Sequence, residues 1–268
     1  MTSTTTIDSQ RAATSHRRDR IFFSAVDTYE NVDLNRGSFN DTSDRVRVSA
    51  AQVLQGRPAV ILIFGQSNGA NSGDAPYVPR NSVFNFNLFD GYCYVARDPL
   101  LGTTESRGNF ASRMADMLIE RNLFDTVVLA PIGVGGSRIE EWTTGGARHR
   151  RLQVVIKRAT DNALTFTHVL WHQGESNAGI DADAELYIGC FLNIHEALRS
   201  YGVDAPIYVA QATICNSPLG QRSAHALGIG GLGDRTDRPF RSNPLAGRVG
   251  QHGGQIDHAG GLVDGGGL

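Results

Sequence analysis

Several features are scarce in this chain, and each scarcity argues against a class of function. Lysine occurs once, at Lys157, and the formal net charge of the 268 residues is only −2. Nucleic acids and anionic membranes attract proteins through strong positive fields, so neither is an expected partner. No apolar run approaches the roughly 20 residues of a membrane-spanning helix, which argues against insertion into a bilayer.

Cysteine is scarce as well. Cys93, Cys190 and Cys215 are far apart in the sequence and form neither a metal-ligand pair nor a disulfide framework. None of them lies beside a histidine in a recognisable nucleophile context. The histidines also lack metal-ligand spacing. The thiols are therefore interpreted as inert, and no metal is expected.

The chain is predicted to consist of four segments. Residues 1–20 are rich in Ser, Thr and Arg and lack the apolar core of a signal peptide, so they are expected to be a disordered tail. The literal sequence therefore indicates a cytoplasmic protein, although a different start would leave room for a leader. Residues 21–57 are expected to be a surface lead-in, and residues 58–216 an α/β domain. Residues 217–268 hold nearly half of the 31 glycines and are expected to be disordered or read in a shifted frame.

Apolar runs and helical periodicity alternate within residues 58–216. Strands are expected at residues 58–64, 126–130, 168–171 and 206–210. Helices are expected at residues 107–121, 149–164 and 183–200, and Gly202 is expected to cap the last one. This alternation predicts a mainly parallel sheet with helices on both faces.

Each of the first two helices has one apolar face. The residues on these faces are Phe110, Met114, Met117 and Leu118 in the first helix and Leu152, Val155, Ile156 and Ala159 in the second. The basic run from Arg148 to Arg151 is interpreted as a solvated helix start.

Three short motifs follow three of the expected strands. They are Gly65-Gln66-Ser67-Asn68-Gly69, Gly133-Val134-Gly135-Gly136-Ser137 and Trp171-His172-Gln173-Gly174-Glu175-Ser176-Asn177. Ligands of open α/β sheets bind just beyond the carboxyl ends of parallel strands. The three motifs are therefore expected to meet in one active site.

The residue types in these motifs suit acyl transfer by a serine. Ser67 lies in a glycine-flanked turn, and its hydroxyl needs a base to become a good nucleophile. The Ser67 amide, an amide of the Gly135-Gly136 turn and the Gln173 side chain are candidate donors to an oxyanion. The first motif also fits the nucleophile elbow of α/β-hydrolases. That fold is disfavoured because few strands precede Ser67 and the glycine-rich element follows it.

Together the motifs resemble the SGNH (GDSL-like) hydrolases, specifically the sialate O-acetylesterase and carbohydrate esterase family six group. The resemblance covers about residues 58–216 and rests on Gly65-Gln66-Ser67-Asn68, on Gly135-Gly136-Ser137 with Ile139 and Trp142, and on Gln173-Gly174-Glu175-Ser176. It implies a flavodoxin-like three-layer α/β/α sandwich and ester hydrolysis without a cofactor or metal. It also implies an acetylated carbohydrate substrate, with Ser67 as nucleophile and Ser67, Gly136 and Gln173 as the oxyanion hole; Gly135 is the alternative to Gly136.

The chain departs from this family at the catalytic base. The family ends with an Asp-x-x-His block, whereas the nearest counterpart here is Gln255-Ile256-Asp257-His258. His258 is predicted as the base on this match. An acid normally orients such a histidine, and Glu175 is the substitute that the motifs offer.

Further roles remain open at this stage. Asn68, Gly135, Glu175 and Trp142 are candidate substrate contacts, with core packing as the alternative for Trp142. His172 is interpreted as a packing or supporting residue. Loops 71–106 and 138–150 are expected to shape substrate choice. The rival interpretation of the whole chain is a non-catalytic carbohydrate-binding relative, or an inactive truncated homologue, that lacks the base.

Overall fold

The computed structural model describes residues 38–178, 180, 183–210, 212, 215–217 and 220–222. Within them, seven strands form a sheet of order β1-β4-β3-β5-β2-β6-β7. Its parallel strands are β3 (Val83–Phe86), β5 (Thr126–Pro131), β2 (Pro58–Gly65), β6 (His168–His172) and β7 (Ile207–Val209). At one edge β4 (Cys93–Val95) and β1 (Arg47–Val48) run antiparallel. The parallel strands depart from the flavodoxin order in that β5 lies between β3 and β2.

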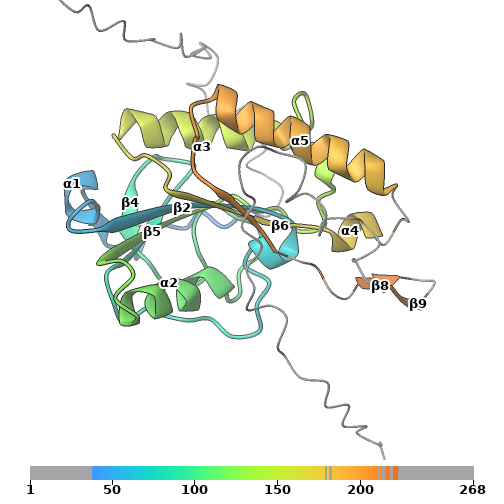
Figure 1. Ribbon diagram of the computed structural model, residues 1–268. Helices are drawn as coiled ribbons and strands as arrows, with labels where there is room; N and C mark the ends of the chain where they lie inside the picture. Colours follow the sequence, from blue (N-terminus) through green and yellow to red (C-terminus); the bar gives the residue numbers. More distant parts are fainter. Residues whose placement is uncertain are drawn as a thin grey trace, which may run out of the picture.

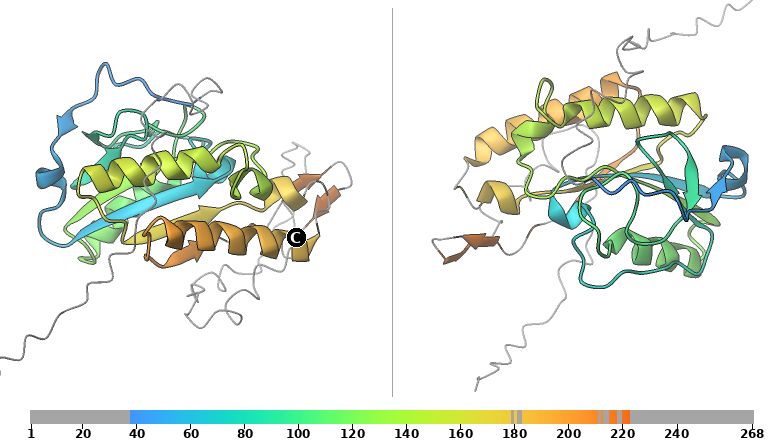
Figure 2. Two further views of the ribbon diagram at one scale, coloured as in Figure 1. Left: turned by 90° about the horizontal axis from the view of Figure 1, so that it is seen from above. Right: turned by 180° about the vertical axis from the view of Figure 1, so that it is seen from behind.

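Helices cover both faces of this sheet. Helices α3 (His149–Asp161) and α5 (Ala184–Ser200) lie over one face, and α2 (Phe110–Glu120) lies over the other (Figure 1; Figure 2). The sheet is mainly parallel and sits between two helical layers. This arrangement confirms the predicted α/β/α fold class.

The strand pattern separates two apolar cores because successive side chains point to opposite faces. Val60, Leu62 and Phe64 of β2 pack toward α3 and α5, while Ile61 and Ile63 pack toward α2. All five side chains are at most 2% exposed. The continuous apolar run of β2 thus reflects a central strand that is buried on both faces.

The predicted strands and helices are present with boundaries shifted by a few residues. Helix α5 begins after Asp183, whose side chain accepts a hydrogen bond from the amide of Glu185 at 3.2 Å. At its other end Gly202 has a φ of +83°, and the amides of Gly202 and Val203 bond back to Arg199 and Leu198 at 3.0 Å each. Gly202 therefore ends the helix as predicted, because this left-handed conformation suits glycine.

The sequence does not predict five short strands and two short helices of the described residues. β3 and β4 lie inside the segment expected to be a loop, and β1 and α1 (Ala50–Val53) lie inside the lead-in. β8 (Cys215–Ser217) pairs with β9 (Gly220–Arg222) beside α4 (Glu175–Ala178), although no strand was expected after residue 217. These elements have two to four residues each, too few for periodicity to be read. The predicted disorder or frame shift of the tail otherwise lies outside the described residues, as does the N-terminal tail.

The predicted apolar face of α2 is half right: Met114 and Leu118 are partly buried against the sheet core, but Phe110 and Met117 are not. Phe110 and Met117 are 40% and 47% exposed, whereas Ala111 and Ala115 are fully buried against the sheet. Small alanine side chains let the helix backbone lie close to the strands. Asp116 is buried beside them and accepts hydrogen bonds from the segment at residues 77–81. The α3 face, in contrast, is buried as predicted.

The basic run at the start of α3 is not solvated, which corrects its interpretation. Arg148 and Arg151 are only 8% and 2% exposed. Arg151 donates to the carbonyl oxygen of Ile132 at 3.0 Å, to that of Gly102 at 2.5 Å and to the Ser38 hydroxyl at 3.2 Å. It therefore ties α3 to the end of β5, from which the second motif leaves the sheet.

No helix in the described segments has both the length and the apolar composition that crossing a bilayer requires.

Replacing Arg151 with Met should lower the free energy of unfolding by about 2–4 kcal/mol, because buried acceptors lose their donor. Urea unfolding followed by circular dichroism measures this change. Arg121→Met, at an exposed position, is the control and should stay within about 0.5 kcal/mol of the parent. Equal stabilities for the two variants would contradict the role of Arg151.

Candidate active site

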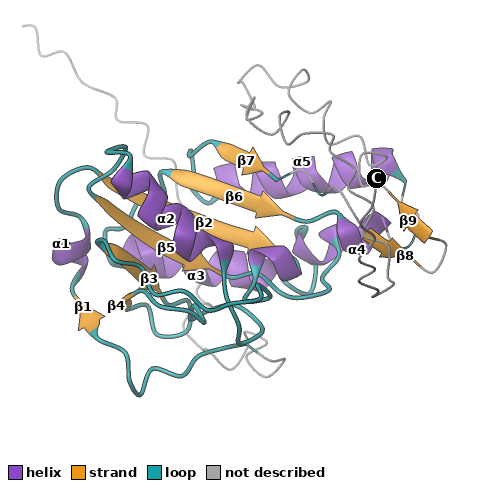
Figure 3. Ribbon diagram, turned by 90° about the horizontal axis from the view of Figure 1, so that it is seen from below, coloured by secondary structure: helices purple, strands orange, loops and turns teal. Residues whose placement is uncertain are grey.

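The three motifs meet at the carboxyl ends of β2, β5 and β6. Gly65 lies opposite His172 in the parallel register of β2 and β6. The Gln66 amide donates to the His172 carbonyl at 2.9 Å, and the Val134 amide donates to the Gly65 carbonyl at 2.9 Å. The strand ends point toward α4 (Figure 3). The predicted convergence of the motifs is thus present in the structure.

Gln66 joins the first motif to the third through its side chain. Its Oε1 accepts hydrogen bonds from the amides of Gly174 at 3.3 Å and Ser176 at 2.9 Å. The side chain is 4% exposed. The turn that carries Ser67 is therefore fixed relative to the turn that carries Gln173.

Ser67 begins the short 3-10 helix η2 (Ser67–Gly69) directly beyond β2. The amide of Gly69 bonds to the Gln66 carbonyl at 2.8 Å, and the amide of Ala70 bonds to the Ser67 carbonyl at 2.9 Å. Within the described part of the chain, neither the hydroxyl nor the amide of Ser67 forms a hydrogen bond. Both groups are therefore available to a ligand.

The two glycines of the second motif differ in what their amides do. The Gly135 amide donates to the Thr104 hydroxyl at 2.7 Å, so it is already occupied. The Gly136 amide has no such partner among the described residues. Gly136 has a φ of +69°, and a Cβ added there would meet nothing within 4 Å. Gly136 is exposed and its amide is unoccupied among the described residues, which favours Gly136 over Gly135 as a donor.

Gln173 is fully buried, and its amide group is held in one orientation. Its Nε2 donates to the Asn177 Oδ1 at 2.6 Å and to the Ser137 carbonyl at 3.3 Å. Asn177 is itself fixed, since its Oδ1 also accepts from the Ile139 amide at 3.0 Å and its Nδ2 donates to Glu140 at 3.0 Å. The Gln173 Oε1 is buried without a partner in the described segments.

Asn177 belongs to the third motif, but the motif alone assigns it no role; its position four residues after Gln173 is the sequence signal that points to it. Thr104, which occupies the Gly135 amide, had no comparable signal in the sequence.

Glu175 links the first and third motifs by a second route. Its Oε1 accepts a hydrogen bond from Asn68 at 2.7 Å and lies 3.8 Å from Nε2 of His172. Its Oε2 is buried and has no partner among the described residues. Burial lowers the pKa of His172 against the opposing effect of the Glu175 charge, so the imidazole is neutral at pH 7. The ring packs edge-on to Phe110 at 6.0 Å, which agrees with a packing role.

Trp142 does not reach the site surface, which corrects its assignment as a candidate substrate contact. It is 0% exposed and lies in η3 (Ile139–Trp142), edge-on to Phe64 and Trp171. Its Nε1 donates to the Ser137 hydroxyl at 3.0 Å. Trp142 is therefore a core-packing residue, and its hydrogen bond to Ser137 supports the second motif.

The other histidines lie apart from Ser67 or outside the described residues. His149 bonds to the Trp142 carbonyl at 2.9 Å and to the Tyr201 hydroxyl at 2.6 Å. His168 stacks on Tyr208. His258, the predicted base, lies outside the described residues.

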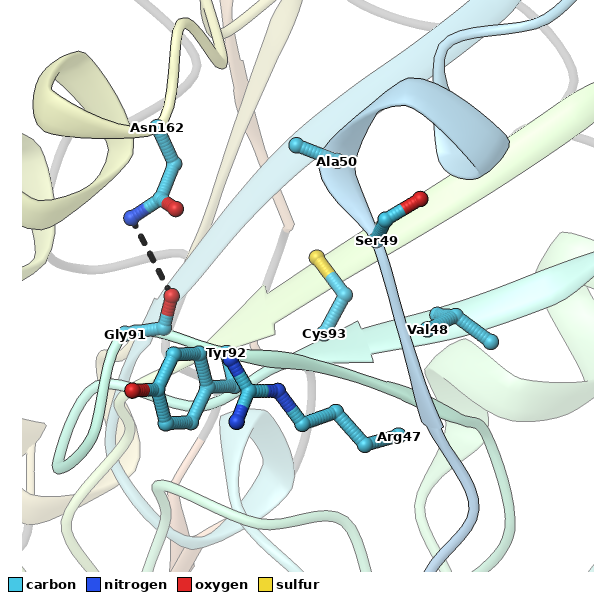
Figure 4. Close-up of a pocket in the computed structure, with 8 residues that line it drawn as sticks. All are labelled: Arg47, Val48, Ser49, Ala50, Gly91, Tyr92, Cys93 and Asn162. Carbon is cyan, nitrogen blue, oxygen red and sulfur yellow. Dashed lines mark hydrogen bonds between the residues drawn. The ribbon is translucent and has the colours of Figure 1, made fainter.

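A cavity of about 460 Å³ lies between α1 and β4, away from these motifs (Figure 4). It is lined by Arg47, Val48, Ser49, Ala50, Gly91, Tyr92, Cys93 and Asn162. The Arg47 guanidinium stacks on the Tyr92 ring. Burial raises the pKa of the Cys93 thiol to about 12, so it stays protonated at neutral pH. The cavity contains no residue of the three motifs.

In the described segments, no group of three or more His, Cys, Asp or Glu side chains is arranged to hold a metal ion.

The fold and the converging motifs define an α/β protein with a serine at the ends of parallel strands. Residues 57–226 match the family model described as "Carbohydrate esterase, sialic acid-specific acetylesterase", and the chain belongs to that family. The match includes β8 and β9 and ends ten residues beyond the predicted domain boundary at 216.

Three solved structures are similar to this chain. A protein from Arabidopsis thaliana is 20% identical, with 60% of this chain and 77% of that chain covered and a TM-score of 0.49. NanS is 18% identical, with coverages of 59% and 68% and a TM-score of 0.44. A carbohydrate acetylesterase from Xanthomonas citri is 18% identical, with coverages of 57% and 41% and a TM-score of 0.37. No curated protein matches the chain.

Gly65 and Gly136 should respond differently to alanine. A Cβ at Gly65 would overlap the His172 carbonyl, and φ there is +126°. Gly65→Ala should cost more than about 3 kcal/mol of unfolding free energy, and Gly136→Ala only about 1–2. Gly189→Ala, in the open middle of α5, is the control and should stabilise by about 0.5–1 kcal/mol. A Gly65→Ala variant as stable as Gly136→Ala would contradict the close approach of Gly65 to the His172 carbonyl.

Stability should fall as the pH drops below about 6.5, the pKa of histidine in the unfolded chain. Burial lowers the pKa of His172, His168 and His195 in the folded chain, so the unfolded chain binds protons first. Above pH 6.5 the neutral histidines contribute their full share to the free energy of unfolding. This contribution declines as the pH falls toward the lower pKa values that the histidines have in the folded chain. His172→Gln should reduce this decline, by at most about 1.4 kcal/mol per pH unit. Urea unfolding at pH 7.5 and 5.5 measures it, and an undiminished decline in the variant would contradict the assignment.

Proposed function

We propose that this protein is a serine acetylesterase that removes O-acetyl groups from a carbohydrate through an acetyl-serine intermediate. The observation that carries the proposal is the Ser67 hydroxyl, which has no hydrogen-bond partner among the described residues. Its turn is fastened to the Gln173 turn by the Gln66 side chain, which accepts from the amides of Gly174 and Ser176. A family of carbohydrate acetylesterases supplies the substrate class.

The reaction has two steps. The Ser67 oxygen attacks the acetyl carbonyl carbon while a base takes the hydroxyl proton. The bond from the carbonyl carbon to the sugar oxygen then breaks, and the sugar oxygen leaves with that proton. Water next attacks the acetyl-Ser67, its proton passes to the same base, and acetate leaves as Ser67 regains its proton.

Three donors are proposed for the oxyanion that forms in each step. The amides of Ser67 and Gly136 are without partners in the described segments, and both follow strands that end at the same edge of the sheet. Gln173 supplies the third donor if its longer hydrogen bond, 3.3 Å to Ser137, is exchanged for the oxyanion. The 2.6 Å bond to Asn177 would meanwhile hold the amide in place. Donors fixed before the reaction stabilise developing charge most effectively.

The proposed base is His258, with Glu175 as the acid that orients it. The buried Oε2 of Glu175 lacks a partner among the described residues, so it can accept a hydrogen bond from an imidazole. Asn68 fixes the other carboxylate oxygen at 2.7 Å. A carboxylate in this position stabilises the imidazolium that forms during attack. In this arrangement Asn68, Gly135 and Glu175 lie beside the substrate. None of them reacts with it, and Glu175 acts only by orienting the base.

Hydrolysis of p-nitrophenyl acetate by the full chain tests this function. Ser67→Ala should lower kcat/KM by about 1000-fold or more, because the covalent intermediate is lost. Ser82→Ala, at an exposed strand start, is the control and should match the parent.

Parallel variants identify the base. His258→Ala should abolish the Ser67-dependent rate, and His172→Gln should leave most of it. Equal rates for the parent and Ser67→Ala would contradict the esterase and favour the carbohydrate-binding relative that lacks a base.

A further inference from the structure

Glu105 lies outside the three motifs, in the connection between β4 and α2, yet its loop is fastened to the second motif. The Thr103 hydroxyl and the Thr104 amide donate to the Gly133 carbonyl at 2.7 and 3.1 Å. The Gly135 amide donates in return to the Thr104 hydroxyl at 2.7 Å. Glu105 is therefore presented directly beside the turn that carries Gly136.

The backbone of Glu105 is in a conformation that L-residues other than Gly, Asn and Asp rarely adopt. Its φ is +69°, in the left-handed region. Residues held in such conformations tend to be found at functional sites, where the surrounding structure enforces them. The side chain of Glu105 lies against the glycine turn of the second motif.

The Glu105 carboxylate lies against Gly135. A Cβ added at Gly135 would overlap the Oε1 of Glu105, so the carboxylate lies directly against this glycine. The Oε2 accepts a hydrogen bond from the Ser72 hydroxyl, five residues beyond Ser67. Glu105 thus lies between the first two motifs and is only partly buried.

The charge of Glu105 is not neutralised by a cation in the described segments. The same holds for Glu140, which bonds to Asn177, and for Glu175, which bonds to Asn68 beside the neutral His172. Arg107 and Arg138 are near in sequence but have exposed side chains and form no ion pair with these carboxylates. Among the described residues, the three carboxylates beside the motifs are therefore without a neutralising cation.

We propose that Glu105 is a specificity-determining residue that accepts a hydrogen bond from a sugar hydroxyl and selects uncharged acetylated saccharides over anionic ones. This inference rests on the proposed function, in that the same site receives the acetylated sugar. A carboxylate is a strong acceptor for hydroxyl groups. The Glu105 carboxylate also repels the carboxylate of an acidic sugar. One residue therefore attracts the neutral sugar and disfavours the anionic one.

Binding to the full chain carrying Ser67→Ala tests the inference apart from catalysis. The probes are methyl 2-O-acetyl-β-D-xylopyranoside and 9-O-acetyl-N-acetylneuraminic acid, titrated in a calorimeter. The Ser67→Ala chain should bind the neutral sugar at least about 10-fold more tightly. Adding Glu105→Gln should narrow this ratio by about 10-fold, whereas adding Glu196→Gln, at an exposed position on α5, should not change it.

Glu105→Gly separates recognition from folding. Glycine adopts a φ of +69° without strain, so this variant should unfold at no lower temperature than the Ser67→Ala chain. It should still lose the preference for the neutral sugar. Three outcomes would each overturn the inference. The Ser67→Ala chain binds the anionic sugar more tightly, it binds neither sugar, or the ratio of the two affinities is unchanged in both Glu105 variants.

Turnover of p-nitrophenyl acetate keeps the two proposals distinct. In the chain with Ser67 intact, Glu105→Gln should lower kcat/KM for the acetylated neutral sugar at least about 10-fold more than kcat/KM for p-nitrophenyl acetate, because the latter ester has no sugar to recognise. A parallel loss of p-nitrophenyl acetate turnover and of sugar binding would overturn the specificity role and indicate a structural one. Failure of Ser67-dependent turnover with intact sugar selectivity would instead contradict only the esterase.

Discussion

The parallel pairing of β2 with both β5 and β6 is the constraint on which the site depends. Residues 58–63 of β2 pair with β5, and residues 61–65 pair with β6, so the central strand fixes where both neighbours end. Gln66 N–H and Val134 N–H continue these ladders one step beyond the sheet. Each motif is thus positioned by backbone hydrogen bonds of the central strand. A shift in register would separate Ser67 from Gly136 and Gln173.

The strands around this constraint were predictable because they are buried on both faces and read as continuous apolar runs. The positions of the motifs were predictable from the same runs, because each motif directly follows a buried strand and so lies at the edge of the sheet where ligands bind. The short strands β3 and β4 gave no such signal. β3 contains the fully buried Asn85, whose amide donates to the carbonyl oxygens of Leu101 in a loop and Leu129 in β5. Such burial depends on partners that are distant in sequence.

The same limit explains the errors on α2 and α3. Hydrophobicity alone orients Met117 inward and Arg151 outward, yet each does the opposite. Arg151 is buried because carbonyl and hydroxyl acceptors surround its guanidinium, and Asp116 is buried because amides of the segment 77–81 reach it. A buried charge is tolerated when hydrogen bonds replace its hydration. Sequence periodicity contains no information about those acceptors and donors.

Two buried oxygen atoms of the third motif lack a hydrogen-bond partner among the described residues. They are the Oε1 of Gln173 and the Oε2 of Glu175, and each such atom costs about 1–3 kcal/mol. Gln173 cannot pair its Oε1 by rotating, because Asn177 holds the amide at 2.6 Å and is itself fixed by Ile139. The apolar packing of Phe64, Trp142 and Trp171 offsets this cost just beneath the motifs. The fold therefore keeps polar groups oriented in advance, a condition that binding and charge stabilisation both require.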